Sequence, residues 1–320
     1  MKKKLIIAAM VIVALALVIT VAGGNILYIL ALKPGGMMRF IDGSKILATD
    51  DNVERTNLDV PFAQTGAQED YRNSAQERYL TSFDGLKLHA YYRAADAESH
   101  KYAVICHGYT SRGIDMAVFG EKFRERGFNV LLPDARGHGD SQGDYIGMGW
   151  HERLDTADWI DTIVAEDSLA QIIMMGVSMG GATVMMTSGE DLPDNVKLVI
   201  DDCGYSSAWD EFDFQMGSMF HLPSFPMLNV ADIVCRIRAG YNFKEASAVE
   251  QLKKSDIPTL FIHGEADTFV PFEMVHKVYE AAAGEKYILT VPGAGHGMSA
   301  AVDPDGYWGA IDTAIEKHVK

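Results

Sequence analysis

Short apolar runs alternate with stretches of helical periodicity through most of the chain, and this alternation limits the folds open to it. Apolar runs that are buried on both sides form parallel strands, and helices between them cover the two faces of the sheet. We therefore expect an α/β fold with a mostly parallel central sheet. The predicted strands are 102–106, 128–132, 172–177, 196–201, 259–263 and 287–291, and the predicted helices lie near 114–126, 150–165, 180–188, 272–283 and 304–318.

Two segments depart from the alternation. An Asp-Gly pair at Asp84 and Gly85 lies between two runs of alternating polarity, which predicts a β-hairpin ahead of the parallel strands. The segment from about 205 to 250 is rich in methionine and aromatic residues and is too long for a simple connection. It is predicted to be a helical insertion that forms a cap over the sheet.

The amino terminus carries a long apolar run. Three lysines at 2–4 precede residues 5–32, which contain no charged side chain. A helix needs about 20 apolar residues to cross a bilayer, so we expect a signal-anchor helix over 1–32 that attaches the protein to the cell membrane. The lysines favour a cytoplasmic amino terminus and an extracytoplasmic remainder. The alternative is secretion after cleavage near Ala22 or Gly23. Residues 33–74 are interpreted as a stalk or lead-in, and 75–320 as one globular domain.

Charge and composition exclude several classes of partner. Lys and Arg number 28 against 44 Asp and Glu, a net charge of −16, and such a surface repels nucleic acid. Three cysteines are too few for a disulfide framework. The chain has neither a dinucleotide-binding glycine pattern nor zinc-ligand spacing. We expect no nucleic acid, metal or cofactor, and the sequence leaves the oligomeric state open.

A nucleophilic serine is predicted from the pattern G-x-S-x-G, which occurs at 139–143 and at 176–180. The pattern carries chemistry only at a sharp turn between a strand and a helix, where it exposes the serine hydroxyl. Ser178 follows a predicted strand and precedes a predicted helix, whereas Ser141 lies in a polar loop. We therefore expect Ser178 to be the nucleophile and Ser141 to be a loop residue.

A serine hydroxyl needs a base, and the base needs an acid that orients it. His296 lies in a glycine-rich loop after the last predicted strand, and Asp267 follows the strand 259–263, with Glu265 as its rival. Two backbone N–H groups must also face the developing oxyanion. We expect them to come from Met179, next to the nucleophile, and from Tyr109, in the loop after the strand 102–106.

These residues together resemble the α/β-hydrolases of the serine-esterase kind, over roughly 75–320. The matching segments are His107-Gly108, the loop 134–141, the elbow 176–181, the acid loop 263–271 and Gly295-His296. The resemblance extends to membrane-anchored bacterial hydrolases with a prolyl-oligopeptidase-like catalytic domain, through the leading apolar helix and the stretch 222–226. It implies a mostly structural role for the loop that contains Arg136 and His138.

The resemblance and the apolar cap favour a serine hydrolase that cleaves small-molecule carboxylic esters through an acyl-enzyme on Ser178. Acyl transfer or peptide and amide cleavage on the same residues is an alternative, and a non-catalytic binding module is another. Cap side chains are expected either to line an acyl pocket or simply to pack the cap onto the sheet. The candidates are Met216, Met219, Phe220, Leu222, Phe225 and Met227.

Overall fold

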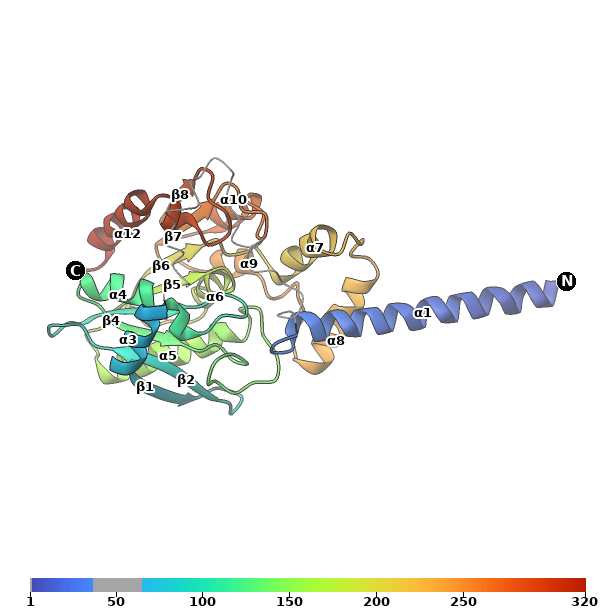
Figure 1. Cartoon of the computed structure of the whole chain (residues 1–320), viewed down its shortest axis with the longest axis horizontal. Helices are drawn as coiled ribbons and strands as arrows, with labels where there is room; N and C mark the ends of the chain where they lie inside the picture. The colour runs from blue at the N-terminus through green and yellow to red at the C-terminus, as the bar shows by residue number, and fades with distance from the viewer. Residues whose placement is uncertain (1, 37–64) are drawn as a thin grey trace.

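The computed structural model describes residues 2–36 and 65–320 (Figure 1). Most of the predicted stalk, residues 37–64, lies outside the described residues. Directly after this gap, helix α3 (Thr65–Ser74) packs onto the domain, and its Tyr71 is completely buried.

An eight-stranded sheet organises the described part of the chain, in the order β1-β2-β4-β3-β5-β6-β7-β8. The hairpin β1–β2 is antiparallel, β2 pairs antiparallel with β4, and all remaining pairs are parallel. This confirms the predicted mostly parallel sheet. The strands are β1 (Gln76–Thr81), β2 (Lys87–Arg93), β3 (Lys101–Cys106), β4 (Asn129–Pro133), β5 (Gln171–Val177), β6 (Val196–Asp202), β7 (Thr259–Gly264) and β8 (Lys286–Val291).

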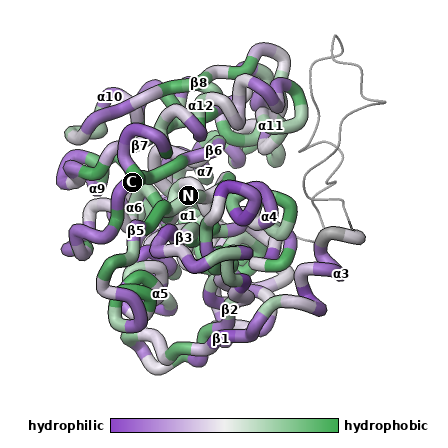
Figure 2. Tube along the Cα trace, turned by 90° about the vertical axis from the view of Figure 1, so that its left-hand side faces the viewer, coloured by the Kyte–Doolittle hydropathy of each residue, from purple (hydrophilic) through white to green (hydrophobic). Residues whose placement is uncertain are grey.

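Helices cover both faces of this sheet because successive strand residues point to opposite sides. Ala103 and Ile105 of β3 pack toward one face, and Val104 packs toward the other. The first face is covered by α3, α4 (Ala117–Glu125) and α12 (Pro304–His318). The second is covered by α5 (Glu152–Glu166), α6 (Met179–Thr187) and α10 (Glu273–Ala281). In Figure 2 the tube is both hydrophilic and hydrophobic along α4 and α5, as expected of helices with one buried face.

The predicted cap is present between β6 and β7. It consists of α7 (Ala208–Ser218), α8 (Met227–Arg238) and the short α9 (Ala248–Leu252). The Ser207 hydroxyl accepts the backbone N–H of Asp210, and the Ser247 hydroxyl accepts that of Glu250, which caps the amino ends of α7 and α9. Figure 1 shows α7 and α8 on the side of the domain from which α1 projects.

Helix α1 (Lys2–Leu32) is long and apolar enough to cross a membrane. Residues 2–19 are exposed, but the last turns of the helix pack on α8. Gly24, Tyr28 and Ala31 are buried at a spacing that places them on one face of the helix. The Arg238 guanidinium lies 5.3 Å from the centre of the Tyr28 ring. The carboxyl-terminal part of α1 therefore belongs to the core of the folded domain.

Candidate active site

The turn between β5 and α6 holds Ser178 in a strained conformation, with φ 58° and ψ −118°. The two flanking glycines make this turn possible. A Cβ at Gly176 would lie 2.0 Å from the carbonyl oxygen of Gly180, and a Cβ at Gly180 would lie 2.1 Å from that of Cys106. Only glycine fits at these two positions, and the tight turn lifts the serine side chain to the carboxyl end of the sheet.

Ser178, His296 and Asp267 are brought together, although they lie far apart in the sequence. The Ser178 Oγ is 2.8 Å from His296 Nε2, and His296 Nδ1 is 2.7 Å from Asp267 Oδ2. All three side chains are buried. With a proton on Nδ1, the histidine donates to Asp267 and accepts the serine hydroxyl proton at Nε2, which is the arrangement that general-base catalysis requires.

Asp267 is held as a carboxylate. Its Oδ1 accepts the backbone N–H groups of Phe269 and Val270, each at 2.9 Å, and His263 Nε2 lies 3.2 Å from its Oδ2. Burial acts to raise the pKa of Asp267, but the electrostatic interaction with His296 and the hydrogen bonds from His263 and His296 outweigh it, so the net pKa lies well below its usual range.

The rival residues lie elsewhere. Glu265 is exposed and accepts a hydrogen bond from the Thr290 hydroxyl. Ser141 donates to the carbonyl oxygen of Asp134 at 2.6 Å and accepts the backbone N–H of His89 at 2.8 Å. Ser141 therefore ties its loop to the hairpin β1–β2, away from His296.

The loop after β3 carries Tyr109 and lies against the nucleophile, since a Cβ at Gly108 would be 3.5 Å from the Cβ of Ser178. Two histidines hold this region through their Nε2 atoms. His138 accepts the backbone N–H of Thr110 at 3.3 Å, and His107 accepts that of Ala135 at 3.0 Å. Burial lowers the pKa of both, that of His138 to about 3, so both rings are neutral acceptors near pH 7.

The backbone N–H groups of Tyr109 and Met179 donate to no other group within residues 2–36 and 65–320. Met179 is the first residue of α6, so its N–H belongs to the unpaired amino end of that helix. Both donors are thus available to an oxygen that develops charge beside Ser178.

Arg136 has a structural environment. Its side chain is completely buried, and it makes a two-point ion pair with Asp155, with Nε–Oδ2 at 2.8 Å and Nη2–Oδ1 at 2.7 Å. A further bond of 2.8 Å joins it to Asp84 of the hairpin turn. This network fixes the loop 134–141 to α5 and to the β1–β2 turn.

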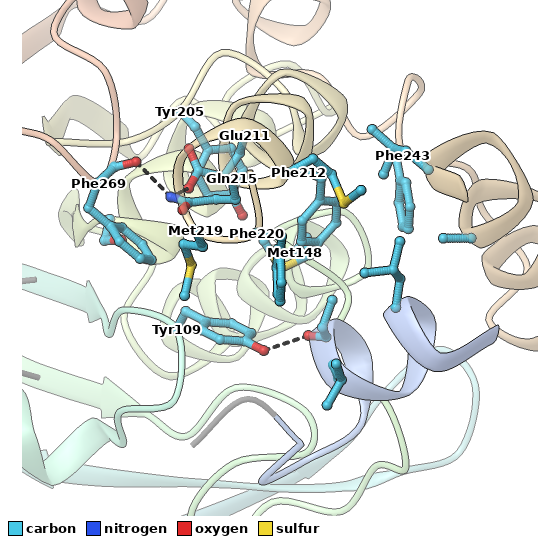
Figure 3. A pocket seen from close by; sticks show the side chains of 17 residues that line it. Tyr109, Met148, Tyr205, Glu211, Phe212, Gln215, Met219, Phe220, Phe243 and Phe269 are labelled. Atoms are coloured by element: carbon cyan, nitrogen blue, oxygen red, sulfur yellow. Dashed lines mark hydrogen bonds between the residues drawn. The ribbon is translucent and has the colours of Figure 1, made fainter. Parts of the chain in front are cut away.

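An apolar pocket opens beside Ser178 (Figure 3). Of the cap candidates, Met216, Met219 and Phe220 line it. Phe225 and Met227 do not line it: Phe225 is 75% exposed in the α7–α8 connection, and Met227 faces Gly23 of α1. The other lining residues are Leu27, Leu30, Ala31, Tyr109, Met148, Tyr205, Glu211, Phe212, Gln215, Leu228, Ala231, Phe243 and Phe269.

One corner of this apolar cavity is polar. Gln215 Nε2 donates to Glu211 Oε1 and to the carbonyl oxygen of Phe269, both at 2.8 Å. The other Glu211 oxygen and the Tyr205 hydroxyl are buried and have no hydrogen-bond partner in the described part of the chain. Burial raises the pKa of Glu211 to about 8, so its carboxyl group is mostly neutral at pH 7. The corner can hold a water molecule or a polar group of a substrate.

Helix α1 supplies part of the cavity wall, in addition to its expected role as an anchor. Leu27, Leu30 and Ala31 line the cavity, and the Tyr109 hydroxyl donates to the carbonyl oxygen of Ala31 at 2.6 Å (Figure 3). The available signals were the length of the apolar run, which exceeds one bilayer span, and the polar Asn25 and Tyr28 near its end.

Two groups of side chains in the described ranges bring potential metal ligands within 4.8 Å of one another: Cys203 with Asp267 and His296, and His89 with Asp134 and Asp140. In the first group, Asp267 and His296 are hydrogen-bonded to each other. Burial raises the pKa of the Cys203 thiol far above its usual value, which disfavours the thiolate that a metal would need. In the second, His89 Nδ1 is bonded to Asp134, which also accepts backbone N–H groups. The histidine and carboxylate atoms already make hydrogen bonds within the protein, and we assign no metal to either group.

Two family models match parts of this chain. A family model described as serine aminopeptidase, S33, matches residues 97–201, and one described as TAP-like protein matches residues 230–305. The uncharacterized protein YqkD of Bacillus subtilis is 27% identical over 251 residues, which cover 77% of this chain and 82% of YqkD.

A named relative and a solved structure extend the comparison. The bifunctional esterase/perhydrolase DCH of Acinetobacter calcoaceticus is 24% identical over 261 residues, covering 69% of this chain and 93% of DCH. The structure of the Pyrococcus furiosus esterase Pf2001 superposes with a TM-score of 0.63 at 20% identity, covering 79% of this chain and 94% of the esterase. With the fold, the elbow and these matches in agreement, the chain belongs to the α/β-hydrolase superfamily.

Proposed function

We propose that the protein is a serine hydrolase that cleaves carboxylic esters. The observation that carries this proposal is the chain of hydrogen bonds from Ser178 through His296 to Asp267. Ser178 Oγ attacks the ester carbonyl carbon while His296 Nε2 takes its proton. His296 then gives that proton to the departing alcohol, and the acyl–oxygen bond breaks. Water, activated by His296, hydrolyses the acyl-serine and releases the carboxylic acid.

The backbone N–H groups of Tyr109 and Met179 are the proposed oxyanion hole. Each tetrahedral intermediate places a negative charge on the former carbonyl oxygen, and preorganised donors stabilise this charge without rearrangement. Loss of one such donor costs about 3 kcal/mol in other serine hydrolases. Asp267 keeps His296 in the tautomer that accepts the serine proton, and it stabilises the imidazolium that forms.

Esters are favoured over peptides by the cavity next to Ser178. Its wall is mostly aliphatic and aromatic, which suits an acyl chain better than a polypeptide with unpaired backbone groups. The names of the esterase relatives support the same choice. Acyl transfer and amide cleavage would use the same residues, and they are distinguished by product analysis with added alcohol or amine acceptors and by amino-acyl amides as substrates.

We further propose that α1 remains attached and anchors the protein in the cell membrane by a single span. The lysines at 2–4 would stay in the cytoplasm, and the hydrolase domain, residues 75–320, would lie outside it. An amino-terminal epitope detected only after permeabilisation of the cells, with a carboxyl-terminal epitope accessible without it, is the expected result. The reverse accessibility would refute this orientation.

The catalytic proposal is tested on the full chain in detergent with Ser178→Ala. We expect the variant to lose turnover of a short-chain p-nitrophenyl ester and labelling by a fluorophosphonate probe, while its circular dichroism stays unchanged. Ser141→Ala is the matched control, because it removes the other serine of the same sequence pattern, and it should retain labelling. Absence of labelling in the wild-type protein would favour a non-catalytic binding module.

A further inference from the structure

The end of α1 places the cavity very close to the expected membrane surface. About 20 apolar residues cross the hydrocarbon, so a span that begins at Leu5 ends near Gly24. The first cavity-lining residue, Leu27, follows three positions later, and Ala31 follows after seven. At 1.5 Å per helical residue these side chains lie only about 5 to 10 Å beyond the hydrocarbon.

The cap also exposes apolar side chains around the base of α1. Phe225 is 75% exposed and Leu222 is 43% exposed in the α7–α8 connection, and Ile233 and Ile237 are exposed on one face of α8. The connection leads into the amino end of α8, which lies close to α1, because a Cβ at Gly23 would be 2.8 Å from the Sδ of Met227. Large apolar side chains gathered beside a membrane helix are expected to insert into the lipid interface.

The cavity itself is suited to hydrocarbon. Leu27 and Leu30 of α1 line it together with cap residues such as Phe212 and Met216, and Ser178 is among the lining residues. The polar groups that line it include the neutral Glu211 carboxyl and its partner Gln215, which lie in one corner. An acyl chain can therefore occupy the remainder without burying a charge against it.

From these observations, and resting on the proposed esterase function, we infer that the substrates are ester lipids taken directly from the bilayer that holds α1. The acyl chain lies between α1 and the cap, with its carbonyl carbon at Ser178, and hydrolysis yields a free fatty acid and the alcohol. Helix α1 is then a specificity-determining wall of the pocket as well as an anchor.

Substitutions on two sides of α1 test the role of this wall. Leu30 lines the cavity, whereas its neighbour Ile29 is 39% exposed and does not. Full-length wild type, Leu30→Trp, Leu30→Ala and Ile29→Trp are compared on p-nitrophenyl esters from butyrate to palmitate. Leu30→Trp should lower kcat/KM for laurate and palmitate by about tenfold or more relative to its own value for butyrate, because the pocket loses room for at least two methylene groups.

The other variants keep the test independent of folding defects. Leu30→Ala should shift the preference toward longer or bulkier acyl chains, and Ile29→Trp should keep the wild-type profile. Identical chain-length profiles in all four proteins would overturn the inference while leaving the proposed function intact. A wild-type protein that hydrolyses no ester and takes no fluorophosphonate label would instead refute the proposed function.

The source of the lipid is tested with phosphatidylcholine vesicles that contain the full-length protein. Methylumbelliferyl oleate is added either to the same vesicles or to separate vesicles without protein. The initial rate of fluorophore release should be much higher when the ester shares the bilayer with the enzyme. Equal initial rates in the two arrangements would refute entry from the bilayer.

Discussion

Substitution of Gly24 by Ala tests whether α1 is docked on the cap as closely as the structure indicates. The new Cβ would lie 2.5 Å from both Cβ and Cγ1 of Val230, and 2.9 Å from the backbone nitrogen of Ala231. Val230 is β-branched and the second contact is backbone, so neither can move aside without displacing one helix. Overpacking of this kind costs roughly 1–3 kcal/mol.

This cost acts on docking rather than on helix formation. The part of α1 that enters a membrane stays helical whether or not its end is docked, so the higher helix propensity of alanine favours both states alike. A cost of 1–3 kcal/mol lowers the docking equilibrium constant by about fivefold to a little over a hundredfold. The Leu27, Leu30 and Ala31 wall should then separate from the cap in a larger fraction of molecules.

Hydrogen exchange on the full-length protein in detergent measures this opening. Gly24→Ala should accelerate exchange in α8 and at the amide of Ile146, which donates to the carbonyl oxygen of Leu32 at 2.7 Å. Exchange in α12 should not change. Gly23→Ala is the control: its Cβ would meet the flexible Met227 sulfur at 2.8 Å, which can rotate away, so its effect should be smaller. Unchanged exchange in Gly24→Ala, or equal effects of the two variants, would refute the close packing.

Three further substitutions address stability, each measured by urea unfolding of the full chain. Arg136→Met should lower the free energy of unfolding by roughly 3–5 kcal/mol, because it leaves Asp155 buried without its partner. A decrease below about 1 kcal/mol would contradict the structural role of this ion pair. Glu211→Gln should stabilise the protein increasingly as pH rises, because burial raises the pKa of Glu211 in the folded state to about 8. Between about pH 4.5 and 8 the folded wild type therefore binds more protons than the unfolded chain, and its free energy of unfolding falls by up to about 1.4 kcal/mol per pH unit. A stability difference between variant and wild type that does not change with pH would argue against this. Gly309→Ala should stabilise α12 by about 0.5–1 kcal/mol, because no atom lies within 4 Å of the new Cβ, and a destabilised variant would show that the position is not open.

The sheet and the grouping of Ser178, Asp267 and His296 follow from local patterns. Parallel strands with continuous burial have a simple sequence signature, and the carboxyl ends of neighbouring strands meet at one edge of the sheet. The strand–turn–helix context separates Ser178 from Ser141, although both have the same pattern of glycines. The choice of Asp267 over Glu265 depends on which side of the turn after β7 each side chain occupies. This direction is a property of the folded turn and has no local sequence signature.

The cavity was harder to predict because its lining depends on the rotation of helices and on contacts between distant segments. Glu211 and Gln215 are four residues apart on α7 and share an inward face, but the sequence does not define that face. Phe225 was expected in the pocket from its apolar character, and it lies in a connection between helices instead. The uncharged run 5–32 within α1 likewise does not indicate which side of the helix packs on protein.

The docked end of α1 also bears on processing of the amino terminus. Cleavage after Ala22 or Gly23 would create a new α-amino group at Gly23 or Gly24, where the chain is packed against Met227 and Val230. That group would be positively charged, at the amino end of a helix whose dipole already carries positive charge there, and partly removed from water. A chain cleaved here would thus place its charged amino group in the contact between α1 and α8, which is energetically unfavourable. The intact helix passes through the same contact without any charge.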